Sequence, residues 1–132
     1  RDGLNTLTPA VDKAVSAFIK DIYQRDMAED VLLVMTGEFG RTPRINKNGG
    51  RDHWGNLCPL VFVGGGLKMG QVIGQSDPHG GEPISDHVSS QQVLATIMNT
   101  LFDTGKLRLQ QGIPREIEAT MTGGDPIYQL FS

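Results

Sequence analysis

Apolar residues recur at three- and four-residue spacing in two segments of the chain, and this spacing predicts two amphipathic helices. The first is expected over residues 7–26, with Thr8 as its cap and Pro9 at the first helical position. The second is expected over residues 89–103, with a serine at its start as the cap. The stripe that this second helix should bury consists of Val93, Leu94, Ile97, Met98 and Leu101.

Two other segments, residues 31–35 and 57–66, are apolar almost without interruption, and we expect them to form strands. Because they lack the polar alternation of a half-exposed strand, both faces should be covered, as in a parallel sheet. Residues 67–87 should form a short hairpin or an extended loop, and residues 105–132 a surface arm with a short helix. The order of helix, strand, polar loop, strand and helix is typical of a layered α/β fold.

The polar loop between the two predicted strands concentrates the chemistry of the chain. Residues 36–54 hold four glycines, four cationic side chains, two carboxylates, a histidine and a tryptophan. In α/β sheets, ligands bind in loops beyond the carboxyl ends of the strands. This loop therefore lies where such a fold would place a functional site.

Several residues of this loop are candidates for binding a metal ion or an anion. Glu38, beside Gly37, could ligate a hard cation or act as a base, or it could be a solvated loop glutamate. Asp52 and His53 offer oxygen and nitrogen ligands for zinc or manganese, although a histidine with a hydrogen bond in a loop would look the same. Trp54 could shield such a site from water. Four cations could bind an oxyanion or form a solvated basic loop: Arg41, Arg44, Lys47 and Arg51.

Composition adds fewer constraints. The net charge of -3 over 132 residues gives no reason to expect a nucleic-acid partner. No apolar run approaches the roughly 20 residues that span a bilayer. The single cysteine, Cys58, excludes an internal disulfide and should be buried. His79 and His87 lie in turn-rich and cap-like contexts that favour structural roles, and the chain has no P-loop, dinucleotide-binding or nucleophile-elbow pattern.

The order of three motifs, "VMTGEFG", "DHWGNLCPLVFVGGG" and "VSSQQVLATIMNTLF", resembles the alkaline phosphatase superfamily, which includes the sulfatases. A closer resemblance is to the bacterial sulfatase-like family of unknown function DUF1501, through "GEFGRTP", "NGGRDHW" and "GGG". The resemblance implies an alkaline-phosphatase-like α/β fold with a mostly parallel sheet and flanking helices. Residues 1–104 would be the C-terminal part of that domain and residues 105–132 its C-terminal arm.

The resemblance also implies roles for individual residues. His53 matches a metal-binding histidine of the superfamily, and Glu38 falls where the superfamily has a metal-binding aspartate. Phe39 stands where an adjacent histidine ligand would be, which favours a single cation, zinc, manganese or calcium, or an altered site. Asp52 and Arg41 match the closer family's own motif, and we expect a ligand role for Asp52 and oxyanion binding for Arg41. The nucleophile motif belongs to the N-terminal half of such domains and is not found in this chain, so we expect no turnover by the chain alone.

Three interpretations follow from these residues. The first is part of a metal-dependent sulfate or phosphate ester hydrolase. It would act on an ester substrate, such as a glycan ester, and would need the remaining half of the domain or another chain. The second is a binding or assembly module that kept the fold and lost the two-metal site. The third is a purely structural loop, with Asp52 paired to an arginine and His53 capping a turn. The closer family further implies export of the parent protein from the cytoplasm.

Overall fold

The longest element is helix α1, Asp2–Gln24, in a computed structural model that describes residues 2–131. The helix begins earlier than the sequence predicts, so the expected cap at Thr8 is wrong and Pro9 lies inside the helix. The apolar spacing explains the difference, because Leu4 and Leu7 continue the row that includes Val11. Pro9 lacks the amide hydrogen of one intrahelical bond, yet the helix runs through it.

Strands β1 (Leu32–Thr36) and β4 (Leu60–Gly64) form the main ribbon of the structure. Both predicted strands are confirmed with shortened bounds, but they pair antiparallel, with Leu32 opposite Gly64 and Thr36 opposite Leu60. The expected parallel pairing is therefore wrong. An unbroken apolar run shows that both strand faces are apolar, whereas strand direction depends on the connection. Here the connection contains no crossover helix, so the chain returns along the strand that it has just left.

Two small hairpins extend from this ribbon. One pairs β2 (Gly40–Arg41) with β3 (His53–Trp54), and the other pairs β5 (Gln75–Ser76) with β6 (Pro83–Ser85). The second confirms the hairpin expected within residues 67–87. The described residues thus form a mixed α/β structure with three two-stranded antiparallel sheets.

Helix α2 (Ser90–Leu101) confirms the second predicted helix, and Ser89 is its cap. Ser89 and Gln92 form a reciprocal capping box, which satisfies two backbone N–H groups at the helix start. The predicted buried stripe is only partly correct. Ala95 and Thr96 are the most buried residues of the helix, whereas Leu94 and Leu101 are exposed. The small side chains at the buried positions allow the C-terminal segment to approach the helix closely.

The C-terminal segment contains more structure than the single short helix that its weak periodicity predicts. It forms α3 (Thr104–Leu107), α4 (Arg115–Thr122) and the 3₁₀ helix η1 (Tyr128–Leu130). Its end is not a surface feature, since Ile127 and Leu130 are buried against Leu67. Around this cluster pack Leu32, Phe62, Met69, Ile73 and Val88.

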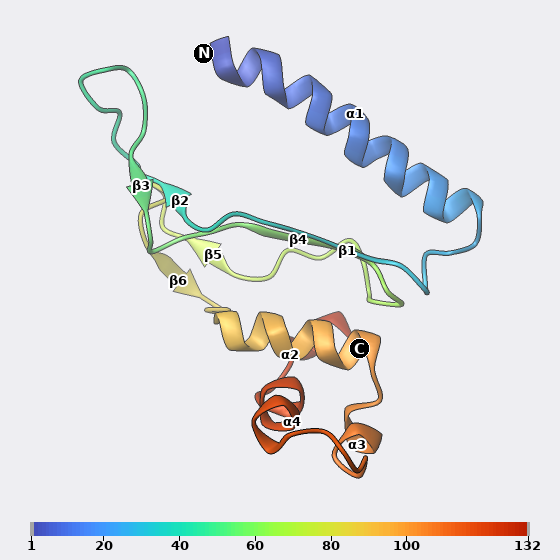
Figure 1. Cartoon of the computed structure of the whole chain (residues 1–132). Coiled ribbons are helices and arrows are strands. Elements are labelled where there is room, and N and C mark those ends of the chain that lie inside the picture. The colour runs from blue at the N-terminus through green and yellow to red at the C-terminus, as the bar shows by residue number, and fades with distance from the viewer. Residues whose placement is uncertain (1, 132) are drawn as a thin grey trace.

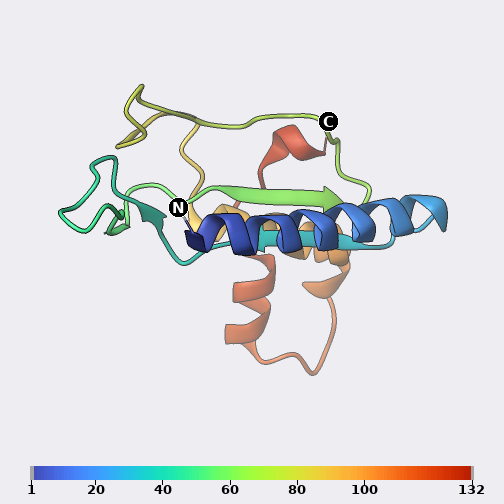
Figure 2. The same cartoon turned by 90° about the horizontal axis from the view of Figure 1, so that it is seen from above.

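The ribbon lies between α1 on one side and α2 with α4 on the other (Figure 1). Seen from above, α1 runs along the length of the two strands (Figure 2). Only Ile22 of α1 is buried among the described residues. Leu4, Leu7 and Val11 remain 72%, 66% and 51% exposed. The apolar core therefore forms on the α2 side of the ribbon, and most of the apolar face of α1 stays uncovered.

Candidate functional site

The β2–β3 hairpin contains or adjoins the four residues to which the family resemblance assigns site roles, Glu38, Arg41, Asp52 and His53. It follows the carboxyl end of β1, with Glu38 two residues beyond Thr36. Because β4 is antiparallel to β1, the carboxyl end of β4 lies at the other end of the ribbon. Of these two strands, β1 is therefore the one whose carboxyl end leads into the hairpin. Gly40 makes the close return possible, since a Cβ atom there would lie 2.1 Å from the Leu57 carbonyl oxygen.

Polar side chains in the tip of this hairpin mainly bond to the hairpin itself. The Asn46 side-chain oxygen accepts hydrogen bonds from the Asn48 and Gly50 amides, each at 3.0 Å. The Asn46 amide donates to Asp52 Oδ1 at 2.8 Å. Arg51 Nη1 donates to the carbonyl oxygens of Thr42 and Pro43 at 2.8 and 2.9 Å. Asp52 and Arg51 therefore hold the shape of the tip, and Asp52 bonds to Asn46 rather than to the arginine that the structural interpretation expects.

His53 stacks on an aromatic neighbour rather than capping a turn. Its ring centroid lies 3.9 Å from that of Phe39, with an interplanar angle of 31°. The Arg41 guanidinium carbon lies 6.0 Å from the centre of the same Phe39 ring, a distance compatible with a weak cation–π interaction. Arg41 is also the strand partner of His53. Phe39 thus brings the histidine and the arginine to one exposed patch.

Trp54 anchors the hairpin to the rest of the molecule. Its indole N–H donates to the Gly81 carbonyl at 2.6 Å, and nearby the Asn56 amide donates to Glu82 at 2.6 Å. The sequence predicts that Trp54 shields a site from water. Its hydrogen bond to Gly81 could not be predicted, because the residues next to Trp54 in the sequence do not indicate a partner 27 positions away. The anchor fixes the base of the hairpin against the β5–β6 turn.

That turn is organised by Asp77, which the sequence analysis does not single out. Asp77 Oδ1 accepts hydrogen bonds from the Gly81 amide at 2.7 Å and the His79 amide at 3.1 Å. The Gly81 hydrogen bond is the main reason why the pKa of Asp77 lies below its ordinary value. The signal in the sequence is the segment "SDPHGG", where an aspartate before proline and glycines favours a turn. His79 accordingly belongs to an exposed turn, as expected.

The three predicted metal ligands do not form one cluster. No group of three or more histidine, cysteine, aspartate or glutamate side chains within residues 2–131 is placed to hold a metal ion. Asp52 and His53 are adjacent in sequence, but their side chains have different partners, Asn46 for Asp52 and Phe39 for His53. Glu38 is exposed, and its carboxylate makes no hydrogen bond or ion pair with any described residue. Glu38 and His53 individually offer an oxygen and a nitrogen donor, which are donor types that a divalent cation accepts.

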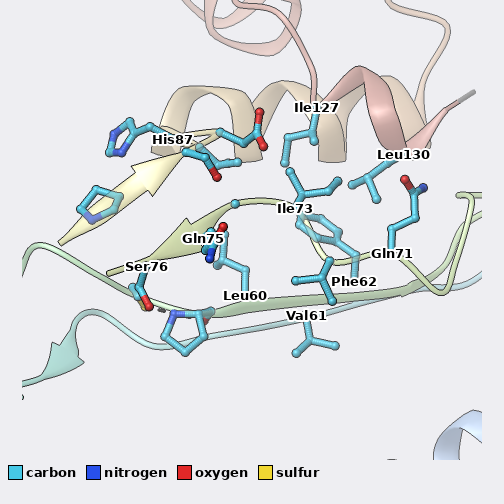
Figure 3. A pocket seen from close by; sticks show the side chains of 18 of the residues that line it. Leu60, Val61, Phe62, Gln71, Ile73, Gln75, Ser76, His87, Ile127 and Leu130 are labelled. Atoms are coloured by element: carbon cyan, nitrogen blue, oxygen red, sulfur yellow. Dashed lines mark hydrogen bonds between the residues drawn. The ribbon is translucent and has the colours of Figure 1, made fainter. Parts of the chain in front are cut away.

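A cleft of about 590 Å³ opens between β4, residues 68–76, β6 and the C-terminal segment (Figure 3). Cys58, which is half-buried rather than fully buried, lines one end, and its Sγ donates to the Gly37 carbonyl at 3.2 Å. His87, a residue that the sequence treats as structural, lines the cleft near β6 (Figure 3). No sequence pattern predicts this cleft, because its walls come from segments far apart in the chain.

The family model described as Protein of unknown function (DUF1501) matches residues 1–128. The chain therefore belongs to the DUF1501 family, as its motifs predicted, whereas the resemblance to the alkaline phosphatase superfamily stays a prediction. No curated protein and no solved structure matches the chain. None of the helices in the described part of the chain is long and apolar enough to cross a membrane.

Proposed function

We propose that this chain contributes the C-terminal part of the active site of a metal-dependent sulfate or phosphate ester hydrolase of the alkaline phosphatase superfamily. Glu38 and His53 would hold a divalent cation, and Arg41 would bind an oxygen of the ester group. The observation that carries the proposal is the shared placement of His53 and Arg41 around Phe39, just beyond the carboxyl end of β1.

The chemistry of these side chains fits that role. A divalent cation supplies charge that polarises a phosphoryl or sulfuryl oxygen. Glu38 and His53 are the donor types that zinc and manganese accept. Arg41 offers a planar fork of N–H groups that matches a tetrahedral oxyanion. Because the described residues provide two donors, the remaining ligands and the nucleophile would come from outside residues 2–131.

Asp52 has a different role in this proposal from the one that the sequence suggests. Its carboxylate accepts the Asn46 amide and its backbone amide donates to Thr42 Oγ1 at 3.1 Å. We therefore assign Asp52 to the stability of the hairpin. Replacing it should loosen the tip without removing a direct metal ligand.

One observation favours a second candidate function, a binding or assembly module without catalysis. Phe39 occupies the position at which the superfamily has a histidine ligand, and no three-ligand group forms among the described residues. Such a module would bind an anionic glycan or a protein partner through the same patch. It would show no dependence on Glu38 for a cation.

We test the proposal by metal analysis and calorimetry on the longest native polypeptide that contains residues 1–132. The first prediction is that one equivalent of Zn²⁺ or Mn²⁺ binds, and that Glu38→Ala or His53→Ala weakens this binding by at least about 100-fold, since a direct ligand should matter more than the 10–100-fold of outer-shell groups. His79→Ala is the matched control, because His79 lies in an exposed turn of the second hairpin. It should bind metal like the wild type.

A screen with 4-nitrophenyl sulfate and 4-nitrophenyl phosphate then separates the two candidate functions. Metal-dependent turnover that Arg41→Ala reduces would support the hydrolase. Absence of bound metal, or equal metal affinity in the Glu38 and His53 variants, would reject it in favour of the module. Export of the parent protein is a further proposal from the family resemblance, and fractionation of the native host with an antibody against residues 2–131 would test it.

A further inference from the structure

The cleft beside the hairpin has an apolar interior. Figure 3 shows Phe62 of β4 and Ile73 of the loop that follows β4 pointing toward Ile127 and Leu130. Val61, the neighbour of Phe62 on the same strand, points the other way. The space of about 590 Å³ falls within the roughly 300–1,000 Å³ of small-molecule sites. A ligand group that packed against these four side chains would contact hydrocarbon, whereas Gln71, Gln75 and His87 add exposed polar groups to the lining.

The wall formed by residues 68–75 is fixed in place before any ligand binds. The Gln71 amide nitrogen donates to the Lys68 carbonyl at 2.9 Å and to the Gln129 carbonyl at 2.8 Å. The Lys68 amide also donates to the Leu130 carbonyl at 2.8 Å. These contacts join the loop to the C-terminal segment. They leave Val72 at the edge of the cleft, 96% exposed, where an apolar ligand would cover it.

One end of the cleft adjoins the proposed site. Asn56 and Cys58 line that end, and Cys58 bonds to the carbonyl of Gly37, the residue before Glu38. Asn56 and Trp54 also tie this region to Glu82 and Gly81, next to the β6 wall. The apolar space thus begins at the base of the hairpin and runs toward Leu130. A molecule whose charged group lay at the hairpin could extend its other end into the cleft.

We propose that the cleft binds the apolar body of the substrate, so that the substrate class is a sulfate or phosphate ester of an aryl or long-chain alkyl alcohol rather than of a sugar. This inference rests on the proposed function for the ester group, whereas the apolar body is argued from the cleft. Sugar hydroxyls that packed against Phe62, Ile73 and Leu130 would lose their bonds to water. The polar side chains of the lining, such as Gln71, Gln75 and His87, are exposed to solvent rather than buried with these apolar groups. Alkyl and aryl groups gain free energy from the same burial.

Calorimetric titration with methyl, butyl and hexyl sulfate, each below its micellar concentration, tests the cleft directly. Burial of roughly 0.8 kcal/mol per CH₂ group predicts about a threefold to fourfold gain in affinity for each added carbon that enters the cleft. Glucose 6-sulfate is the polar comparison and should bind no more tightly than methyl sulfate. These measurements need no turnover.

Two substitutions on strand β6 give a matched pair. Ser85 lines the cleft and is exposed, so Ser85→Trp should fill the space without disturbing the core and reduce hexyl sulfate affinity at least tenfold. Ile84 precedes it, points to the opposite face and is 59% exposed. Ile84→Trp should leave the affinity unchanged.

The outcomes separate this inference from the proposed function. Equal affinity for methyl and hexyl sulfate, or no effect of Ser85→Trp, would overturn the cleft as the binding site. If hexyl sulfate binds as expected but no ester is turned over and no metal is bound, the cleft stands and the hydrolase fails. If glucose 6-sulfate is hydrolysed while hexyl sulfate fails to bind, the hydrolase stands and the proposed substrate class fails.

Discussion

At the scale of single residues, the least exposed side chain in the described structure is a polar one. Thr96 on α2 has 0% exposure. Its Oγ1 donates to the Gln92 carbonyl at 2.7 Å and accepts from the Ile127 amide at 2.9 Å. The hydroxyl therefore satisfies a backbone N–H that has moved out of contact with water. Thr96 lies outside the expected apolar stripe because its side chain is polar. The spacing of apolar residues carries no information about its hydrogen-bond partner, the Ile127 amide.

Thr96→Val keeps the shape of the side chain and removes both hydrogen bonds. We expect a loss of about 1–3 kcal/mol in the free energy of unfolding, because the buried Ile127 amide loses its partner. Urea denaturation followed by circular dichroism would measure it. Thr100→Val is the control, since Thr100 Oγ1 bonds only to the Thr96 carbonyl within the same helix. An equal loss in both variants would show that the Ile127 contact is unimportant.

At the scale of elements, the β5–β6 hairpin depends on its turn as much as on its strands. The two strands together offer five residues, which is short for a hairpin to be stable by itself. The Asp77 carboxylate holds the Gly81 and His79 amides, and the Gly81 carbonyl in turn accepts the Trp54 indole. One side chain thus connects the turn to the candidate site.

The lowered pKa of Asp77, caused first by the Gly81 amide, predicts a pH dependence of stability. A carboxyl group with a depressed pKa stabilises the folded state fully above its ordinary value of 3.8 and loses this contribution as the pH falls through the folded value. The stability difference between the wild type and Asp77→Asn should therefore be constant from neutral pH to about pH 5 and shrink below 3.8. Urea denaturation at several pH values would measure it, and a difference that stays constant down to pH 2 would contradict the assignment.

At the scale of the whole molecule, the end of the chain completes the core. Leu130 is 8% exposed and Ile127 is 6% exposed, and both pack on Leu67. On the other side of the ribbon, α1 leaves Leu4 and Leu7 in water. The main core of the described residues therefore lies on one side of the ribbon, and the C-terminal segment belongs to that side.

Leu130→Ala should reduce the free energy of unfolding by about 2–4 kcal/mol, because it removes a buried side chain from a small core. Leu109→Ala changes the same side chain in the same C-terminal segment, but Leu109 is 83% exposed. We expect a change within about 0.5 kcal/mol for this control. Thermal denaturation of both variants would show the contrast, and equal small effects would mean that residues 105–131 behave as a surface arm.

The sequence alone determined the local elements of this protein. Apolar spacing located two helices, unbroken apolar runs located β1 and β4, and a serine at position 89 or 90 marked the start of α2. The loop motifs also indicated the DUF1501 family, which the match over residues 1–128 shows. These features depend on neighbours in the chain, whose geometry is set by backbone periodicity and local hydrogen bonds.

The way in which these elements meet depends on contacts between distant parts of the chain. The tertiary structure set the antiparallel pairing of β1 with β4, because direction depends on the whole path of the intervening loop. It joined Asp52 to Asn46, and it stacked His53 on Phe39. It also gave Thr96 its partner from residue 127 and formed the cleft from distant segments. Most of these features join residues that are far apart in the sequence. The types of the side chains limit which contacts are possible, and the path of the chain selects which of those contacts form.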